Sequence, residues 1–351
     1  MRLRDFVFST LAAGGLLLSA APGRTQSSFL TPPVVPMPPA MTLTMPGAPQ
    51  FPGEEAVPAP PARPAAPAAP APPSMGMNLR GGSRSWHDGP VSDCSGLHAQ
   101  FNDEDAAVES EPRAFSKREV QVLRVDELEN GGIQLQGWDK EVYSVTACKA
   151  ADATRGDVKQ LLSEIKLSVQ GGRVSVSGPS RHDDWNVFLL IRTPRAAEVE
   201  LVAHNGPVSF YSVDGKITAR GVNGPISMED CSGEADISAV NGPIRFSGTG
   251  GKLRLHTQNG PISVALHAAS WSGDGLVADA VNGPLTLRVP SGFQSSFLVE
   301  SNGHSPISCQ ASICNDARKT WDDQHRRIEY GSGAPLIRLS TENGPISVNT
   351  L

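Results

Sequence analysis

Residues 204–221 read HNGPVSFYSVDGKITARG, and the pattern continues without a gap as VNGPISMEDCSGEADISA (222–239) and VNGPIRFSGTGGKLRLHT (240–257). After each Pro, apolar residues occupy alternate positions, as at Val208 and Phe210, and a second alternating pair follows the next turn. A period of two is typical of strands that bury one face. Each repeat therefore predicts two short strands and two turns.

The tripeptide Asn-Gly-Pro marks one corner of every repeat, and a variant of it carries two extra residues before Pro306. The corner Asn residues are Asn205, Asn223, Asn241, Asn259, Asn282, Asn302 and Asn343. The first four are 18 residues apart, a spacing that indicates coils stacked on one another. Because Asn and Gly both tolerate positive φ, the dipeptide suits a sharp turn. Stacking places the Asn side chains above one another, so we predict a structural ladder of amides, with a ligand-binding row of Asn as the alternative.

The whole pattern predicts an all-β fold. Over residues 201–351 we expect a β-solenoid of stacked two-strand coils of about 18 residues, because one coil alone cannot bury its apolar row. Residues 92–200 predict a smaller strand-rich part, with alternating segments at Arg118–Val125 and Val142–Ala147. Within it, Asp157–Ile165 has helical spacing and predicts one short helix. Further strands are expected at Ile133–Leu135, Lys166–Val169, Arg173–Ser177 and, as a buried strand, Val187–Ile191.

The N-terminal segments have compositions unlike the rest of the chain. Residues 1–26 combine Arg2 and Arg4 with an apolar stretch and small residues, which is typical of a secretory signal peptide; an uncleaved anchor is the alternative. Residues 27–91 are rich in Pro and Ala and predict a semi-rigid linker without a packed core. It is either a tolerated low-complexity segment or a stalk that holds the domain away from a membrane or wall. We therefore expect an exported protein of the periplasm, the cell surface or the medium, tethered to a membrane through its N-terminal segment if at all.

Five cysteines in an exported chain favour two disulfides and one remaining thiol. Cys309 and Cys314 form the first expected pair because only a short loop separates them, and Cys94 with Cys148 is the second. Cys231 occupies a repeat position that other coils fill with small residues, which indicates a buried, unreactive side chain.

At this point the chain resembles the bacterial putative-adhesin β-strand-repeat family, a group of exported proteins without a defined function. The resemblance covers roughly residues 94–351 and includes the strands that follow each Asn-Gly corner. It also includes Asn130–Ile133, Gly137–Asp139, Trp271–Leu276 and Gly331–Gly333. The resemblance implies an exported β-solenoid and supplies no catalytic residues.

Residues that carry chemistry are scattered. The acidic pairs Asp183-Asp184 and Asp322-Asp323 fall in segments that predict solvated loops. The histidines lack metal-ligand spacing; they include His182, His204, His256, His267, His304 and His325. A zinc site made of Cys309, Cys314, His304 and His325 is a weaker alternative to a disulfide. Trp138, Trp185, Trp271 and Trp321 are expected at coil edges rather than against sugars. Residues 310–334 interrupt the pattern with charges and predict an end cap or a binding loop.

These observations lead to a functional prediction. We expect a non-enzymatic envelope or surface protein that uses the solenoid for adhesion or binding, with an unknown envelope protein or glycan as partner. The net charge of −6 and the absence of a basic stripe argue against nucleic acid, and no cofactor or metal is expected. Two alternatives remain open: a carbohydrate-active β-helix enzyme acting on a polysaccharide, and a self-assembling envelope scaffold.

Overall fold

The part of the chain that the structure describes consists mostly of β-strands. The computed structural model describes residues 77–79, 89–101, 104–154, 156–180, 184–302, 305–322, 325–334 and 336–351. All of them belong to one unit, Ala69–Leu351. A single α-helix, α1 (Val158–Glu164), lies among the strands, which confirms the all-β class and the one short helix. The expected signal peptide and nearly all of the expected linker lie outside the described residues.

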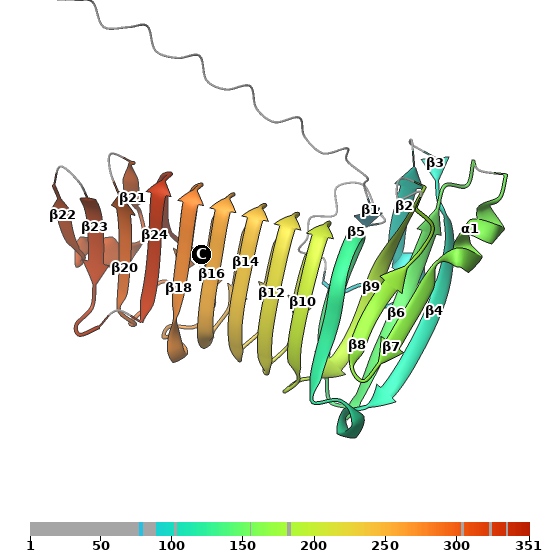
Figure 1. Cartoon of the computed structure of the whole chain (residues 1–351). Coiled ribbons are helices and arrows are strands. Elements are labelled where there is room, and N and C mark those ends of the chain that lie inside the picture. The colour runs from blue at the N-terminus through green and yellow to red at the C-terminus, as the bar shows by residue number, and fades with distance from the viewer. Residues whose placement is uncertain are drawn as a thin grey trace, which may run out of the picture. The chain divides into compact units, whose positions relative to one another are not determined.

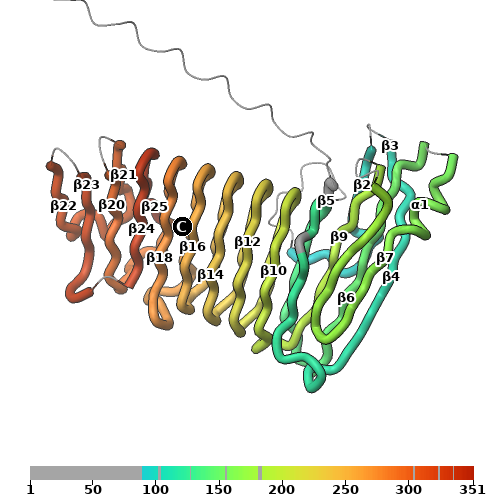
Figure 2. Tube along the Cα trace, in the orientation of Figure 1, coloured from blue at the N-terminus to red at the C-terminus, as the bar shows by residue number. Residues whose placement is uncertain are grey.

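Two sheets of parallel strands face each other, and the chain passes from one to the other at the Asn-Gly corners (Figures 1 and 2). The first, sheet I, contains β10 (Glu198–Asn205), β12 (Lys216–Asn223), β14 (Glu234–Asn241), β16 (Gly250–Asn259), β18 (Ser272–Asn282), β24 (Ile337–Asn343) and β20 (Phe297–Asn302) in spatial order. The second, sheet II, contains β11 (Val208–Tyr211), β13 (Ile226–Glu229), β15 (Ile244–Gly248), β17 (Ile262–Leu266), β19 (Leu285–Val289), β25 (Ile346–Thr350) and β21 (Ile307–Cys309).

The strands pair in a register that places equivalent repeat positions beside one another. Ile226 pairs with Ile244, and Ile244 pairs with Ile262. The three side chains are at most 1% exposed and lie in the apolar core between the two sheets. Burying one such side chain contributes about 1.5–3 kcal/mol. The alternation of the sequence thus predicts correctly which side chains face the core.

The corners explain why glycine recurs. Gly224, Gly242 and Gly260 have φ of 148°, 158° and 155°, a region that residues with a Cβ rarely adopt. A Cβ on Gly242 would lie 2.1 Å from the backbone oxygen of Gly224, because successive corners stack in direct contact. The turn uses positive φ at the Gly and not at the corner Asn, since the positive-φ residues of the described chain other than Gly are Ser212 and Asp230.

The order of the strands departs from the order of the chain near the C-terminus. β24 pairs with β18 on one side and with β20 on the other, and β25 pairs with β19 and β21 in the same way. The last coil of the sequence is therefore inserted before the coil that contains β20 and β21. Figure 1 shows the resulting order, with the C-terminus away from the end of the stack.

At the N-terminal end, one long strand joins both sheets. β5 (Val122–Trp138) pairs with β10 in sheet I through its first half and with β11 in sheet II through its second half. The predicted strands at Arg118–Val125 and Ile133–Leu135 correspond to the two halves of β5, which meet at the Asn130-Gly131 corner. The first strand begins later than predicted, at Val122, because residues 117–119 form a 3₁₀ turn.

Other strands complete this end of the unit. Sheet II continues from β5 through the parallel strand β9 (Trp185–Pro194) and then the antiparallel strands β6 (Val142–Ala151) and β4 (Ala107–Ser116). Sheet I continues through the parallel strand β8 (Arg173–Ser177) and the antiparallel strand β7 (Lys166–Gln170). A small separate sheet contains β1 (Met77–Leu79), β2 (Leu97–Phe101) and β3 (Glu104–Asp105). The predicted strands in this region and the buried face of α1, with Leu161 and Leu162, are present.

The charged excursion forms the opposite end of sheet I. β23 (His325–Tyr330) pairs antiparallel with β20, and β22 (Arg318–Trp321) pairs with β23. All four side chains of β22 are exposed, and they include Arg318 and Lys319. Charged side chains on an edge strand oppose pairing with further chains, so this placement favours the cap over the binding loop.

Replacing Ile244 by Ala removes a fully buried side chain from the middle of the stack. We expect the free energy of unfolding to fall by about 2–5 kcal/mol, as measured by urea denaturation followed by circular dichroism. The control is Arg245→Ala on the same strand, where the side chain faces outward and the change should stay within about 0.5 kcal/mol. Equal losses from the two variants would contradict the assignment of the inner face.

Candidate functional site

The corner Asn side chains form a continuous series of hydrogen bonds. In each bond the Nδ2 of one Asn donates to the Oδ1 of the Asn in the preceding coil, at 3.0–3.1 Å. The series runs through Asn130, Asn205, Asn223, Asn241, Asn259, Asn282 and Asn343. An interior amide thus donates one bond and accepts one bond within the ladder, an arrangement that stabilises the stack.

One expected member does not belong to this series, and one member was not anticipated. Asn302 ends β20, where it pairs in register with His325 of the antiparallel hairpin rather than with a corner Asn. Asn130 begins the ladder, although it lies far from the regular repeats. The motif Asn130-Gly131 is the sequence signal that identifies it.

The variant Asn241→Ala loses one donated and one accepted ladder bond. Because a hydrogen bond contributes about 0.5–1.5 kcal/mol and Asn241 is exposed, we expect a loss of about 1–2 kcal/mol in the free energy of unfolding. The matched variant Asn343→Ala loses the bond to Asn282 and should cost about half as much. Unfolding curves that place Asn241→Ala level with the wild type would disprove a stabilising ladder.

Both expected disulfides are present. Cys309 is bonded to Cys314, and Cys94 is bonded to Cys148 across 54 residues of sequence. Bonded sulfurs are not thiolate ligands, so the zinc alternative at Cys309 and Cys314 is wrong. Cys231 is the remaining thiol; it is 2% exposed and burial raises its pKa to about 12.

A thiol with a raised pKa stays protonated at neutral pH, and only the thiolate reacts with alkylating agents. We therefore expect iodoacetamide to label no cysteine in the folded protein at neutral pH, one in denaturant, and all five in denaturant after reduction. Mass spectrometry counts the labels. Labelling of Cys231 in the folded protein, or of more than one thiol without reductant, contradicts the structure.

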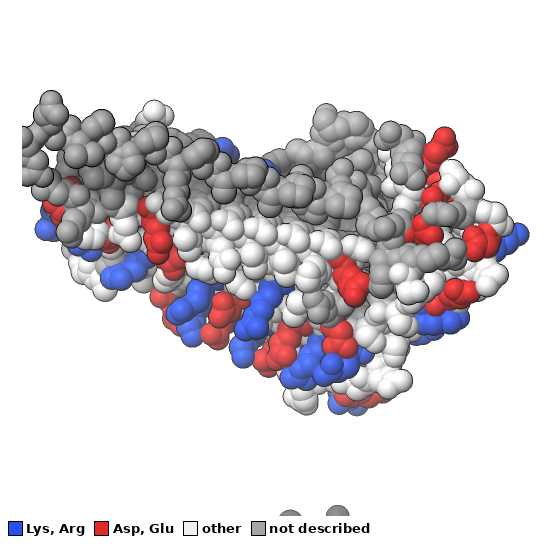
Figure 3. Space-filling view, turned by 45° about the horizontal axis from the view of Figure 1, so that its top comes forward, with Lys and Arg blue, Asp and Glu red and all other residues white. Residues whose placement is uncertain are grey.

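Outward side chains of sheet I form rows that run across the strands. The first row contains Glu198, Lys216, Glu234 and Lys252, one from each successive strand. Lys216 Nζ lies 3.0 Å from Glu198 Oε1, and Lys252 Nζ lies 3.0 Å from Glu234 Oε1. Figure 3 shows Lys or Arg side chains alternating with Asp or Glu over part of the surface. Opposite charges on adjacent strands therefore neutralise one another along this row.

A second row lies beside the first. Its residues in spatial order are Arg124, Glu200, Thr218, Asp236, Arg254, Val277 and Arg338. At its beginning, Arg124 Nε lies 2.9 Å from Glu200 Oε2. Further along, Val277 separates Arg254 from Arg338, and neither of these two side chains forms an ion pair with the described residues.

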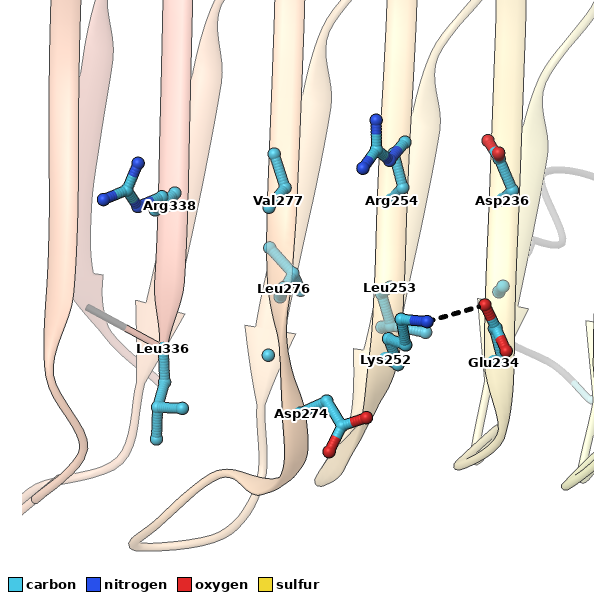
Figure 4. Close-up of a pocket in the computed structure, with 12 residues that line it drawn as sticks. Glu234, Asp236, Lys252, Leu253, Arg254, Asp274, Leu276, Val277, Leu336 and Arg338 are labelled. Atoms are coloured by element: carbon cyan, nitrogen blue, oxygen red, sulfur yellow. Dashed lines mark hydrogen bonds and ion pairs between the residues drawn. The ribbon is translucent and has the colours of Figure 1, made fainter. Parts of the chain in front are cut away.

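The two rows enclose a hollow of about 550 Å³ on β14, β16, β18 and β24 (Figure 4). Glu234, Asp236 and Asp274 contribute carboxylates to it, and Lys252, Arg254 and Arg338 contribute cations. Its floor consists of Val277 and the strand backbones, and Leu336 lies at one end. A smaller hollow of about 340 Å³ lies on β5, β10 and β12 and contains Arg124 and Arg220.

The hollow offers weak support for acid–base catalysis. The Lys252 ammonium donates a hydrogen bond to Glu234 and lowers the pKa of its carboxyl, the opposite of what a general acid requires. Within the described residues, no three His, Cys, Asp or Glu side chains are placed to hold a metal ion.

The end of the stack carries another hollow, of about 530 Å³, lined by Ile307, Trp321, Asp322 and Arg326. Trp321 is 52% exposed, so the expectation of a packed edge position is wrong for this residue. It holds for Trp185 and Trp271, which are 8% and 6% exposed. Trp138 is partly buried; its Nε1 donates to the Val142 oxygen, and Lys140 lies over its ring.

The remaining predicted residues are not brought together. Asp184 lies directly before β9 and is buried, so the expectation of a solvated loop is wrong for it; its backbone oxygen accepts a hydrogen bond from the Asp152 amide. His267 contacts Ser247 and His325 pairs with Asp322, far apart in the register of the sheet. His182, Asp183, His304 and Asp323 lie outside the described residues. None of the helices in the described part has the length and apolar character needed to cross a membrane.

Comparisons with known proteins give distant similarities. No family model and no curated protein match the chain. A putative cell adhesion protein from Clostridium sporogenes is 9% identical, with 70% of this chain and 100% of its own covered and a TM-score of 0.30. A putative adhesin from Bacteroides fragilis is 12% identical, with 69% and 97% covered and a TM-score of 0.35.

A putative adhesin from Parabacteroides merdae is 7% identical, with 72% of this chain and 99% of its own covered and a TM-score of 0.32. These three similar structures are named as adhesins or a cell adhesion protein, as the sequence resemblance leads one to expect. Their low TM-scores and identities carry no argument about what this chain does.

Proposed function

We propose that this protein is a non-enzymatic, exported component of the cell envelope or cell surface, and that its stacked strands form a β-solenoid used for binding or adhesion. The observation that carries the proposal is the outer face of sheet I, where rows of charged side chains border a hollow of about 550 Å³. Stacked coils present extended faces that suit a polymer or another protein.

The in-register pairing supports the solenoid part of the proposal. Equivalent residues of successive coils lie side by side in both sheets, with two strands and one Asn-Gly corner per coil of 18 residues. A continuous apolar core then runs along the stack between the sheets. Such a stack is rigid, because each coil bonds to its neighbours through backbone groups and side chains.

The cysteines support export. Disulfides persist in oxidising compartments and are rare in the reducing cytosol. Cys94–Cys148 ties the segment before β2 to β6, and Cys309–Cys314 closes the turn after β21. Both are consistent with the signal peptide expected in residues 1–26.

The charge arrangement favours binding over catalysis. A carbohydrate-active enzyme would need a carboxylate with a raised pKa, and the pKa of Glu234 in the hollow is lowered. A self-assembling scaffold would need open strand edges. The edge strand β22 carries Arg318 and Lys319, and the edge strand β4 carries Pro112, which cannot donate to a further strand.

Cosedimentation with envelopes isolated from the bacterium that makes the protein tests the proposal. We expect the folded protein to sediment with the envelope and to leave the sizes of the envelope polysaccharides unchanged. Reduced and unfolded protein serves as the control. Absence of sedimentation by the folded protein would overturn the binding function. Shortening of an envelope polysaccharide, seen by gel filtration, would instead establish the enzyme, and concentration-dependent polymers of the protein alone would establish the scaffold.

A further inference from the structure

Two cations in the hollow on sheet I form no ion pair with any residue that the structure describes. Lys216 and Lys252 in the first row each lie 3.0 Å from a carboxylate of the preceding strand. In the second row, Arg254 and Arg338 are exposed and form no ion pair with the described residues, and the residue between them is Val277. Unpaired guanidinium groups are suited to bidentate binding of carboxylates.

The strand order sets the distance between the two arginines. Arg254 lies on β16, Val277 on β18 and Arg338 on β24, and their backbones are direct neighbours in the register. Because neighbouring strands lie about 4.8 Å apart, the backbones of the two arginines are separated by about 10 Å along the row. Figure 4 shows the side chains of Arg254 and Arg338 on either side of Val277, on the same face of the sheet.

The acidic residues of the hollow restrict the ligand further. Glu234, Asp236 and Asp274 balance the charges of Lys252, Arg254 and Arg338, so the hollow as a whole is neutral. A densely charged polyanion would meet these carboxylates and be repelled. A ligand with sparse anionic groups and many hydroxyl donors suits both kinds of side chain, because carboxylates accept hydrogen bonds from hydroxyls.

A peptide is a poorer match to this surface. Peptides commonly bind to sheets by adding a strand at an open edge. β16, β18 and β24 are interior strands whose backbone groups already pair on both sides. Recognition on this face therefore depends on side chains spaced by strands, which suits a stiff polymer with a regular repeat.

We propose, on the basis of the binding function above, that the hollow binds an acidic polysaccharide with a carboxylate on every second sugar. Arg254 and Arg338 each bind one carboxylate, and Val277 lies under the apolar face of the intervening sugar ring. An extended pyranose unit is about as long as the ~4.8 Å spacing between neighbouring strands, so two units match the separation of the two arginine backbones.

Binding of defined polymers to the full-length protein tests the proposal. Hyaluronate has a carboxylate on alternate sugars, polygalacturonate has one on every sugar, dextran is neutral, and polyglutamate represents an acidic peptide. By biolayer interferometry at fixed ionic strength, we expect hyaluronate to bind best. Arg254→Ala and Arg338→Ala should each weaken it about tenfold, the effect of losing one charge-assisted contact.

Two further variants separate a specific site from general charge attraction. Val277→Glu places a carboxylate between the arginines. It should weaken hyaluronate binding as much as Arg254→Ala or Arg338→Ala does. Arg220→Ala removes an exposed Arg from another row of the same face and should leave the affinity within about twofold, inside the usual scatter of a surface substitution. Unfolding midpoints equal to the wild type confirm that each variant is folded.

The polymer-binding experiment can fail without failure of the proposed binding function, and the two failures can be told apart. Equal affinities of wild type and Arg254→Ala, loss of affinity in Arg220→Ala to the same extent, or preference for dextran, polygalacturonate or polyglutamate would each overturn the acidic polysaccharide site. If envelope cosedimentation then persists in the Arg254→Ala/Arg338→Ala variant, binding stands and this site fails. If the wild type fails to sediment, the broader function fails as well.

Discussion

The close stacking of the Asn-Gly corners is the constraint on which the rest of the structure depends. The backbone amides of Gly206, Gly224 and Gly242 donate to the backbone carbonyl oxygen of the Asn in the next corner, at 2.9, 3.1 and 2.9 Å. A side chain on any of these glycines would collide with the neighbouring backbone. Once the corners stack in register, every residue lies beside its equivalent in the next coil, so the apolar columns, the amide ladder and the charged rows all follow from this one contact.

Local patterns predicted much of this fold, and long-range pairing decided the rest. The alternation that places Ile244 in the core and the short loop between Cys309 and Cys314 are both properties of neighbouring residues. The insertion of β24 before β20 depends on which coils bond to each other, which no local pattern records. A signal was nevertheless present, because the two extra residues in the corner after Asn302 mark the coil that does not extend the ladder.

Only part of the candidate site could be predicted from the sequence, because long-range pairing of the coils decides the rest. Aligning the gapless coils shows the alternation from Glu198 to Lys252 directly, because equivalent positions become neighbours. The neighbourhood of Arg338 is different. It lies beside Val277 only because the last coil of the chain is inserted next to β18, so the pair of arginines flanking Val277 has no counterpart in the linear pattern.

Outward positions of a stacked fold are where sequence is least restricted by stability. Exposed ion pairs contribute little to folding, so either charge or a neutral residue can occupy a row at small cost. Rows in which opposite charges lie on adjacent strands are therefore explained without a binding partner. Two cations held apart by an apolar residue depart from that rule without a gain in folding stability, and such departures are expected where a surface has a function. The regular part of the stack thus provides rigidity, and the interruption at Val277 is the place where binding specificity is best sought.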